Sequence, residues 1–338
     1  IQQLRAQVQN LNIYSKKNDS KKMKHLERAL DGQNNFWKYL CNFVASLLGG
    51  SMIGSIPLMI LIAIKTIQNN GAIAPNPANA LDFTAYGISL NVGLALMMLP
   101  FVTGLITAIL LLRPLHKRTF AEVVNGTKSI RWKRAFTGFG IWLVIAALYF
   151  AIDYAISPAN YVLQFDLAAF LPLLLISVLL IPIQTTFEEL LYRGYLGQAI
   201  GAWTKNRWLV VIIPAILFGL SHYANPEIKE YGFWIAMPQY IMFGLVFGLI
   251  TVLDDGIEVS MGLHAANNIF ASLMITNKAS VLQTQAVFSQ QNIDPNKETL
   301  ALLVMSIVFV AILKYHYKWD FKVLNKKVEK QEPEIIVE

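Results

Sequence analysis

Apolar residues along this chain gather into eight long runs that short polar segments separate. Each run comes close to the roughly 20 apolar residues that a helix needs to cross a bilayer, although the fifth and seventh are short or polar. We therefore expect an all-α fold, a polytopic bundle of about eight transmembrane helices. The runs cover residues 36–67, 85–112, 138–156, 167 into the stretch 180–196, 208–223, 233–253, 257–275 and 300–315.

Composition supports a membrane protein. The 338 residues are 55% hydrophobic and 14% charged, whereas soluble domains carry about 25% charged residues. The net charge of +7 is concentrated in tails and loops, and no basic face could follow a nucleic acid, so we expect the lipid bilayer and no nucleic acid as a partner. The single cysteine, Cys41, cannot form an intramolecular disulfide.

Basic residues also predict the orientation of the chain. With the N-terminus inside, both basic tails, the connector 113–134 and the turn at Lys205 and Arg207 fall on one side of the membrane, and the loops between the other helix ends hold few Lys or Arg. This agrees with the positive-inside rule and predicts both termini in the cytoplasm. The short, simple loops favour a bacterial cytoplasmic (inner) membrane. We also expect the connector to lie along the membrane surface as an interfacial helix that Trp132 and Phe136 anchor.

Three of the apolar runs carry polar side chains at helical spacing. In the fourth, Glu188 and Glu189 are adjacent, and Arg193 follows Glu189 by one helical turn, which allows an ion pair. The fifth run ends near His222. In the seventh, His264 and Asn268 are also one turn apart, beside the small residues Gly262, Ala265 and Ala266, which would let another helix approach closely.

Each polar residue alone has an ordinary structural explanation. An intramembrane histidine more often packs in a hydrogen-bonded position, an adjacent Glu pair often ends a solvated helix, and an asparagine can bridge two helices. Ionisable residues within lipid are costly, however, and usually mark function. Together, carboxylate and imidazole are suited to activating water, and an imidazole beside an amide suits an oxyanion.

These residues form three ordered motifs that resemble a known family. Glu188-Glu189-Leu-Leu-Tyr-Arg193, Phe218-Gly-Leu-Ser-His222 and His264-Ala-Ala-Asn-Asn268 are similar to the EExxxR, FxxxH and HxxxN motifs of the CAAX protease and bacteriocin-processing (CPBP, or Abi) family of intramembrane endopeptidases. The resemblance covers about residues 135–275. It suggests a catalytic membrane core there, with a basic N-terminal tail at 1–35, two spans and the connector at 36–134, a loop and last span at 276–316, and a charged tail at 317–338.

The resemblance implies hydrolysis of a peptide bond in a peptide or protein substrate at the membrane. Glu188 would polarise the attacking water, His222 would position that water or shuttle its proton, and His264 with Asn268 would hold the oxyanion. Glu189 and Arg193 would be an orienting ion pair. This mechanism requires no cofactor.

Three alternatives remain open at this stage. The first uses Glu188, His222 and His264 as ligands of a catalytic zinc ion, although no HExxH motif is present. The second is a proton-coupled transporter, since intramembrane Glu and His also build proton relays; no internal repeat of the transporter kind supports it. The third is a non-catalytic scaffold or regulator that binds another membrane protein through residues 1–134.

The depths of the motif residues in their helices do not match. At 1.5 Å per residue, Glu188 lies near the cytoplasmic edge, His264 about 10 Å from it and His222 about 20 Å from it. Convergence requires helix tilt, a kink at Pro182 or a cavity open to the cytoplasm. We expect a water-filled cavity between the fourth, fifth and seventh spans.

Overall fold

A computed structural model describes residues 24–68 and 83–330 of the chain. The first 23 residues of the basic tail, the loop with Pro75 and Pro77, and residues 331–338 lie outside the described residues.

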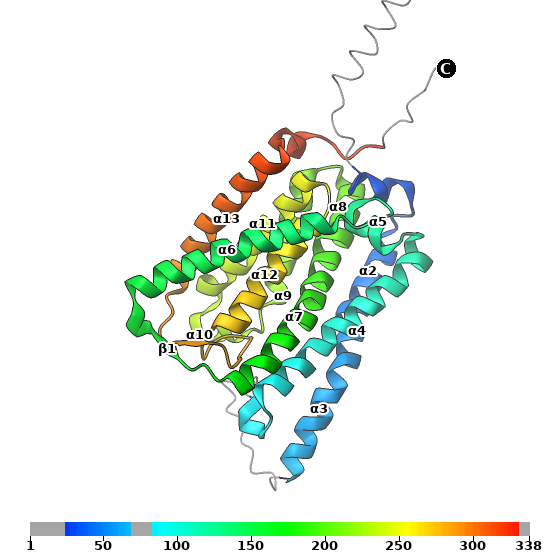
Figure 1. Cartoon of the computed structure of the whole chain (residues 1–338). Coiled ribbons are helices and arrows are strands. Elements are labelled where there is room, and N and C mark those ends of the chain that lie inside the picture. The colour runs from blue at the N-terminus through cyan, green and yellow to red at the C-terminus, as the bar shows by residue number, and fades with distance from the viewer. Residues whose placement is uncertain (1–23, 69–82, 331–338) are drawn as a thin grey trace, which may run out of the picture.

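Long helices packed side by side make up the protein (Figure 1). Every expected span is a helix among the described residues, because a backbone in lipid must satisfy its own hydrogen bonds. The long helical segments are α2 (Phe36–Val44) continuing through the π-helical turn η2 (Ala45–Gly50) into α3 (Ser51–Gln68), α4 (Leu90–His116), α6 (Trp132–Ile156), α7 (Leu167–Glu189) continuing through η5 (Leu190–Leu196) into α8 (Gly197–Thr204), α9 (Arg207–Ser221), α11 (Phe233–Asp254), α12 (Glu258–Met274) and α13 (Pro295–Tyr317).

Six of these segments in the described chain are long and apolar enough to cross a membrane, so this is an integral membrane protein. The fifth and seventh expected spans, α9 and α12, are shorter, with 15 and 17 residues. In α12, 11 of the 17 residues are buried, so other helices largely shield it from lipid. Short helices lie between the spans, η3 (Phe83–Tyr86), α5 (Phe120–Asn125), η4 (Pro158–Asn160) and α10 (Pro226–Tyr231), or flank the first and last span, η1 (Glu27–Asp31) and η6 (Phe321–Asn325).

The connector does not form one helix that carries Trp132 and Phe136. Residues 120–125 form the six-residue helix α5, which a Thr119–Glu122 capping box begins and Gly126 ends with a φ of 74°. Trp132 and Phe136 instead belong to the first turns of α6, which starts six residues earlier than the apolar run. The buried residues Val123 and Val124 explain the difference, because they dock α5 against the bundle.

Both ends of the described chain meet at one end of the bundle (Figure 1). The backbone N–H of Lys24 donates to the Asp255 carboxylate at 2.9 Å. Arg207 pairs with Glu27 and donates to the Lys326 carbonyl oxygen at 3.1 Å. The tails and the turns that the charge pattern places together therefore do lie together.

His25 holds this N-terminal segment in the bundle. Its side chain is fully buried, its ring nitrogen Nε2 lies 3.0 Å from the Val123 carbonyl oxygen, and its own carbonyl oxygen accepts from Gln198 of α8 at 2.9 Å. Burial lowers the pKa of His25 to about 4. The imidazole therefore stays neutral at neutral pH.

The acidic loop after α11 belongs to the same end. Arg131 lies 3.3 Å from Asp254 and 2.5 Å from Glu258, whose side chains are buried. The connector thus supplies the cation for these carboxylates, which explains why an acidic loop lies among basic ones.

A small sheet covers the opposite end. Strand β3 (Phe288–Gln290) pairs antiparallel with β1 (Tyr161–Leu163) and parallel with β2 (Ile275–Thr276), in the order β1-β3-β2. Because β2 directly follows α12, the sheet ties the loop after α12 to the loop between α6 and α7.

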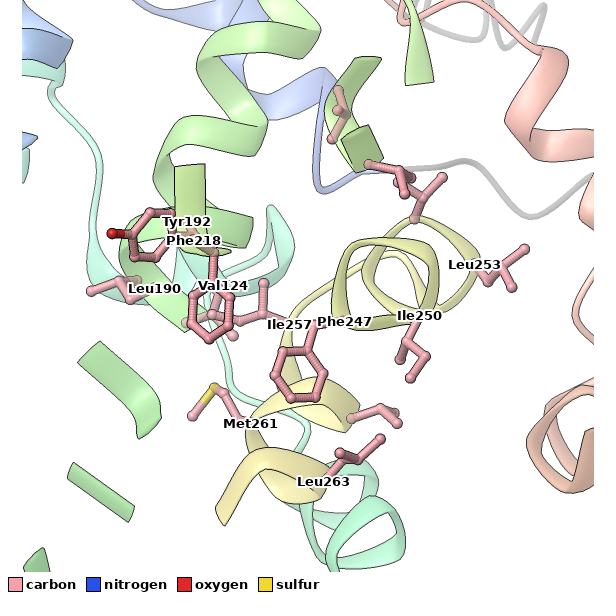
Figure 2. Packing of buried hydrophobic residues seen from close by; sticks show 14 of the residues in the cluster. Val124, Leu190, Tyr192, Phe218, Phe247, Ile250, Leu253, Ile257, Met261 and Leu263 are labelled. Atoms are coloured by element: carbon pink, nitrogen blue, oxygen red, sulfur yellow. The ribbon is translucent and has the colours of Figure 1, made fainter. Parts of the chain in front are cut away.

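Small residues allow α6 and α12 to cross closely, as the sequence predicts for Gly262. A Cβ atom on Gly262 would collide with the Ala135 carbonyl oxygen, and one on Gly138 would come within 2.6 Å of the Val259 carbonyl oxygen. Figure 2 shows the adjoining core, where Phe247 of α11 lies against α12 near Met261.

Candidate active site

A cavity of about 470 Å³ lies within the bundle. Glu188, His222, His264 and Asn268 all line it, so three of the expected spans converge on one space. The cavity is also lined by residues that the sequence analysis did not place there, from α4 and α11: Met97, Met98, Phe101, Gln239, Tyr240, Phe243 and Phe247.

The cavity extends towards the end opposite the basic tails. Its wall includes Glu227 of α10 and Val281 in the loop after β2, where Glu227 Oε1 accepts from the Val281 N–H at 2.9 Å. The charge pattern predicts both loops on the non-cytoplasmic side, so this part of the lining does not support a cavity open to the cytoplasm, one of the three explanations considered for the convergence.

The two adjacent glutamates have different surroundings. Glu188 lines the cavity, and 12% of its side chain is exposed. Glu189 is fully buried behind the cavity wall and pairs with Arg193 at 3.0 Å. The π-helical turn η5 begins directly after Glu189, and such turns are frequent at functional sites.

Arg193 is buried among aromatic rings. Its guanidinium carbon lies 4.2 Å from the centre of the Phe218 ring and 4.9 Å from that of Phe247. In the described chain its Nε and one Nη have no hydrogen-bond partner. The Glu189 ion pair and the ring faces therefore compensate for much of the lost hydration of this cation.

His264 joins the two glutamates. Its Nδ1 lies 2.9 Å from Glu189 Oε1, and its Nε2 lies 3.6 Å from Glu188 Oε2. The imidazole also stacks on Phe247 with ring centres 4.8 Å apart. These contacts hold the ring with Nδ1 directed to the buried glutamate and Nε2 on the cavity side.

His222 faces the cavity from the C-terminus of α9. Its Nδ1 lies 2.7 Å from the Phe218 carbonyl oxygen, an acceptor, so this nitrogen carries the proton. Its ring stacks on Tyr240 with centres 4.5 Å apart and an angle of 23° between the ring planes. The other nitrogen, Nε2, is thereby left as an acceptor.

Two amide side chains, from α7 and α12, lie next to these groups. Asn268 Nδ2 donates to Gln184 Oε1 at 3.1 Å, and Gln184 precedes Glu188 by one helical turn. The Gln184–Asn268 pair therefore lies one turn from the Glu188–His264 pair. Sequence reasoning missed Gln184; an amide within an apolar run, four residues before Glu188, was the available signal.

The proposed zinc ligands do not form a metal-binding group. Among the described residues, no three His, Cys, Asp or Glu side chains lie close enough to hold a metal ion. We therefore derive no step through a metal.

Comparison with known proteins agrees with the three motifs. The family described as type II CAAX prenyl endopeptidase Rce1-like matches residues 167–270, which include all of them. The uncharacterized protein YyaK of Bacillus subtilis (strain 168) is 32% identical over 293 residues, which cover 86% of this chain and 95% of the relative. No solved structure matches the chain. The chain belongs to the CAAX protease and bacteriocin-processing family of intramembrane proteases.

Proposed function

We propose that this protein hydrolyses a peptide bond of a membrane-associated substrate with a water molecule that Glu188 activates. One observation carries the proposal: Glu188, His222, His264 and Asn268 line a single cavity, and the Glu189–Arg193 ion pair lies behind it. A general base must lie within hydrogen-bond reach of the water whose proton it takes. The cavity offers Glu188 and the free Nε2 of His222 for that task.

The reaction follows from these groups. Glu188 takes a proton from water while His222 Nε2 accepts a hydrogen bond from the same water and orients it. The oxygen of that water bonds to the carbonyl carbon, and the carbonyl oxygen becomes negative. When the C–N bond breaks, Glu188 returns the proton to the leaving nitrogen.

In this proposal His264 and Asn268, which both line the cavity, hold the negative oxygen. With Nδ1–H donated to Glu189, Nε2 becomes a donor only in the doubly protonated imidazole, in which both nitrogens carry hydrogen. In that form two cations, His264 and Arg193, would balance the two negative charges of Glu188 and Glu189. Removing one oxyanion donor from an enzyme typically lowers kcat by about 10²–10³-fold.

Glu189 acts through His264 and Arg193. It accepts from both at 2.9 and 3.0 Å and does not line the cavity. Its role is to hold the imidazole at the angle that leaves Nε2 towards the substrate. Glu189 and Arg193 are therefore positioning residues in this mechanism.

We further propose that the substrate is a peptide with a lipid-anchored or C-terminal segment, because the matching family description names prenyl endopeptidases. The basic ends of the bundle would face the cytoplasm of a bacterial inner membrane. A membrane-protein partner would bind residues 1–134, a region that also supplies Met97, Met98 and Phe101 to the cavity wall.

Cleavage by purified protein in liposomes tests the proposal. Internally quenched peptides ending in a prenylated Cys-aliphatic-aliphatic-X sequence, and the same peptides without the prenyl group, are the probes. We expect Glu188→Gln to lower kcat by about 10²–10⁴-fold, whereas Glu230→Gln, at an exposed position on α10, leaves it unchanged. Full activity of Glu188→Gln, or a wild-type protein that cleaves no probe, would overturn the proposal.

A further inference from the structure

Side-chain hydrogen bonds connect three helices beside the cavity. The indole Nε1–H of Trp142, on α6, donates to Asn267 Oδ1 at 3.2 Å. Asn267 Nδ2 donates to Asn268 Oδ1 at 3.1 Å, and Asn268 Nδ2 donates to Gln184 Oε1 at 3.1 Å. The chain thus begins on α6, crosses two residues of α12 and ends on α7.

Its first member sets the direction of all the others. An indole N–H can only donate, so the oxygen of Asn267 must face Trp142. That orientation directs the amino group of Asn267 to the oxygen of Asn268, and the amino group of Asn268 to the oxygen of Gln184. Trp142 is fully buried, which leaves no water to replace its acceptor.

The last amino group in the chain belongs to a residue of the cavity wall. Gln184 lines the cavity and is 7% exposed. Its Oε1 is occupied by Asn268, and in the described part of the chain no acceptor pairs with its Nε2. Two N–H groups of Gln184 are therefore available to a molecule in the cavity.

The position of Gln184 matches the repeat of an extended peptide. Gln184 precedes Glu188 by four residues, about 6 Å along the helix axis. In an extended chain at about 3.3 Å per residue, every second carbonyl points the same way, at intervals of about 6.6 Å. A donor one turn from Glu188 is therefore spaced to reach a carbonyl oxygen two residues from the scissile one.

We infer that Gln184 is a substrate-binding residue that donates to a main-chain carbonyl oxygen two residues from the scissile bond, and that the chain from Trp142 through Asn267 and Asn268 orients it. This inference rests on the proposed function. It assigns Trp142 and Asn267 a positioning role, and it predicts that the substrate is bound as an extended main chain.

The test pairs enzyme variants with altered peptides. From whichever quenched probe the wild-type protein cleaves, two analogues are made in which a trans-alkene replaces the peptide unit whose carbonyl lies two residues to either side of the scissile carbonyl. We expect one analogue to lower kcat/KM of the wild-type protein by about tenfold or more. Gln184→Met should lose a similar factor on the unaltered peptide and nothing further on that analogue.

Two more variants separate orientation from packing. Trp142→Phe keeps the buried ring but removes the donor, and we expect it to lower kcat/KM about tenfold and to weaken discrimination against the analogue. Ser177→Ala is the matched control, because it removes the 2.9 Å contact between Ser177 of α7 and Ser272 of α12, the two helices that Gln184 and Asn268 also join, away from the cavity. Its kcat/KM should stay within about twofold of wild type.

If the ratio of kcat/KM on the unaltered peptide to kcat/KM on the analogue is the same for Gln184→Met as for the wild-type protein, the inference is overturned. An NMR measurement on protein with ¹⁵N-labelled tryptophan reports on the chain without any substrate. The Trp142 Nε1–H resonance, identified by its loss in Trp142→Phe, should shift in Asn267→Leu; an unchanged resonance also overturns the inference. If that resonance shifts but the wild-type protein cleaves no probe, it is the proposed function that fails, and the substrate role of Gln184 fails with it.

Discussion

Replacing each of the two adjacent glutamates should separate folding from catalysis. Glu189→Ala removes the only ion-pair partner of Arg193 among the described residues and the acceptor of His264 Nδ1. Since the Arg193 side chain is 1% exposed, leaving it unpaired costs about 3–5 kcal/mol. Glu188→Ala removes a cavity-facing carboxylate whose contact with His264 is 3.6 Å, and we expect a loss of about 1 kcal/mol or less.

Thermal unfolding in detergent, followed by tryptophan fluorescence, measures the difference. At about 2 °C per kcal/mol for a chain of this size, Glu189→Ala should lower Tm by about 6–10 °C and Glu188→Ala by no more than about 2 °C. Both should lose cleavage activity. A double variant, Glu189→Ala with Arg193→Met, should recover part of the Tm but not the activity, because it removes the unpaired charge.

Equal changes in Tm for the two single variants would refute the division between them. So would a double variant no more stable than Glu189→Ala, since the loss would then not come from an unpaired Arg193.

Three further outcomes test other parts of the structure. Gly262→Ala should lower Tm because its Cβ would meet the Ala135 carbonyl oxygen, whereas Gly140→Ala, with open space around it, should not; equal Tm values would contradict the close crossing. Because the pKa of His25 is lowered from 6.5 to about 4, the unfolded chain binds this proton first, and Tm should fall as the pH drops from about 6.5 to 4. His25→Gln, which keeps a donor for the Val123 carbonyl oxygen but cannot titrate, should show a smaller fall. Cleavage should persist after chelation and dialysis, with no stoichiometric zinc found by elemental analysis; activity that chelation abolishes and zinc restores would favour a metal mechanism.

The helices could be predicted from the sequence because lipid permits few alternatives. Every long apolar run is helical, and even the polar run that carries His264 and Asn268 forms a helix because other helices bury it. The sequence pattern was misleading in the connector. Trp132 and Phe136 are aromatic residues of the kind that anchor an interfacial helix, but they lie in the first turns of the long span α6.

The motif residues of the candidate site could be predicted from the sequence, but the contacts between its helices could not. Helical spacing is enough to pair Glu189 with Arg193, because both lie on one helix. The contacts of Trp142 with Asn267 and of Asn268 with Gln184 depend on which helices are neighbours and how they are rotated. Spacing within one segment carries no information about either.

The N-terminal segment has a consequence for the order in which the protein assembles. The backbone N–H groups of Lys24 and His25 bind the carboxylate of Asp255, 231 and 230 residues later in the chain. While the chain is being synthesised from its N-terminus, that carboxylate does not exist until six of the eight helical segments have been made. The contact of these first described residues with Asp255 therefore forms only after α11 has been made, whereas the contacts of His25 with Val123 and Gln198 can form earlier.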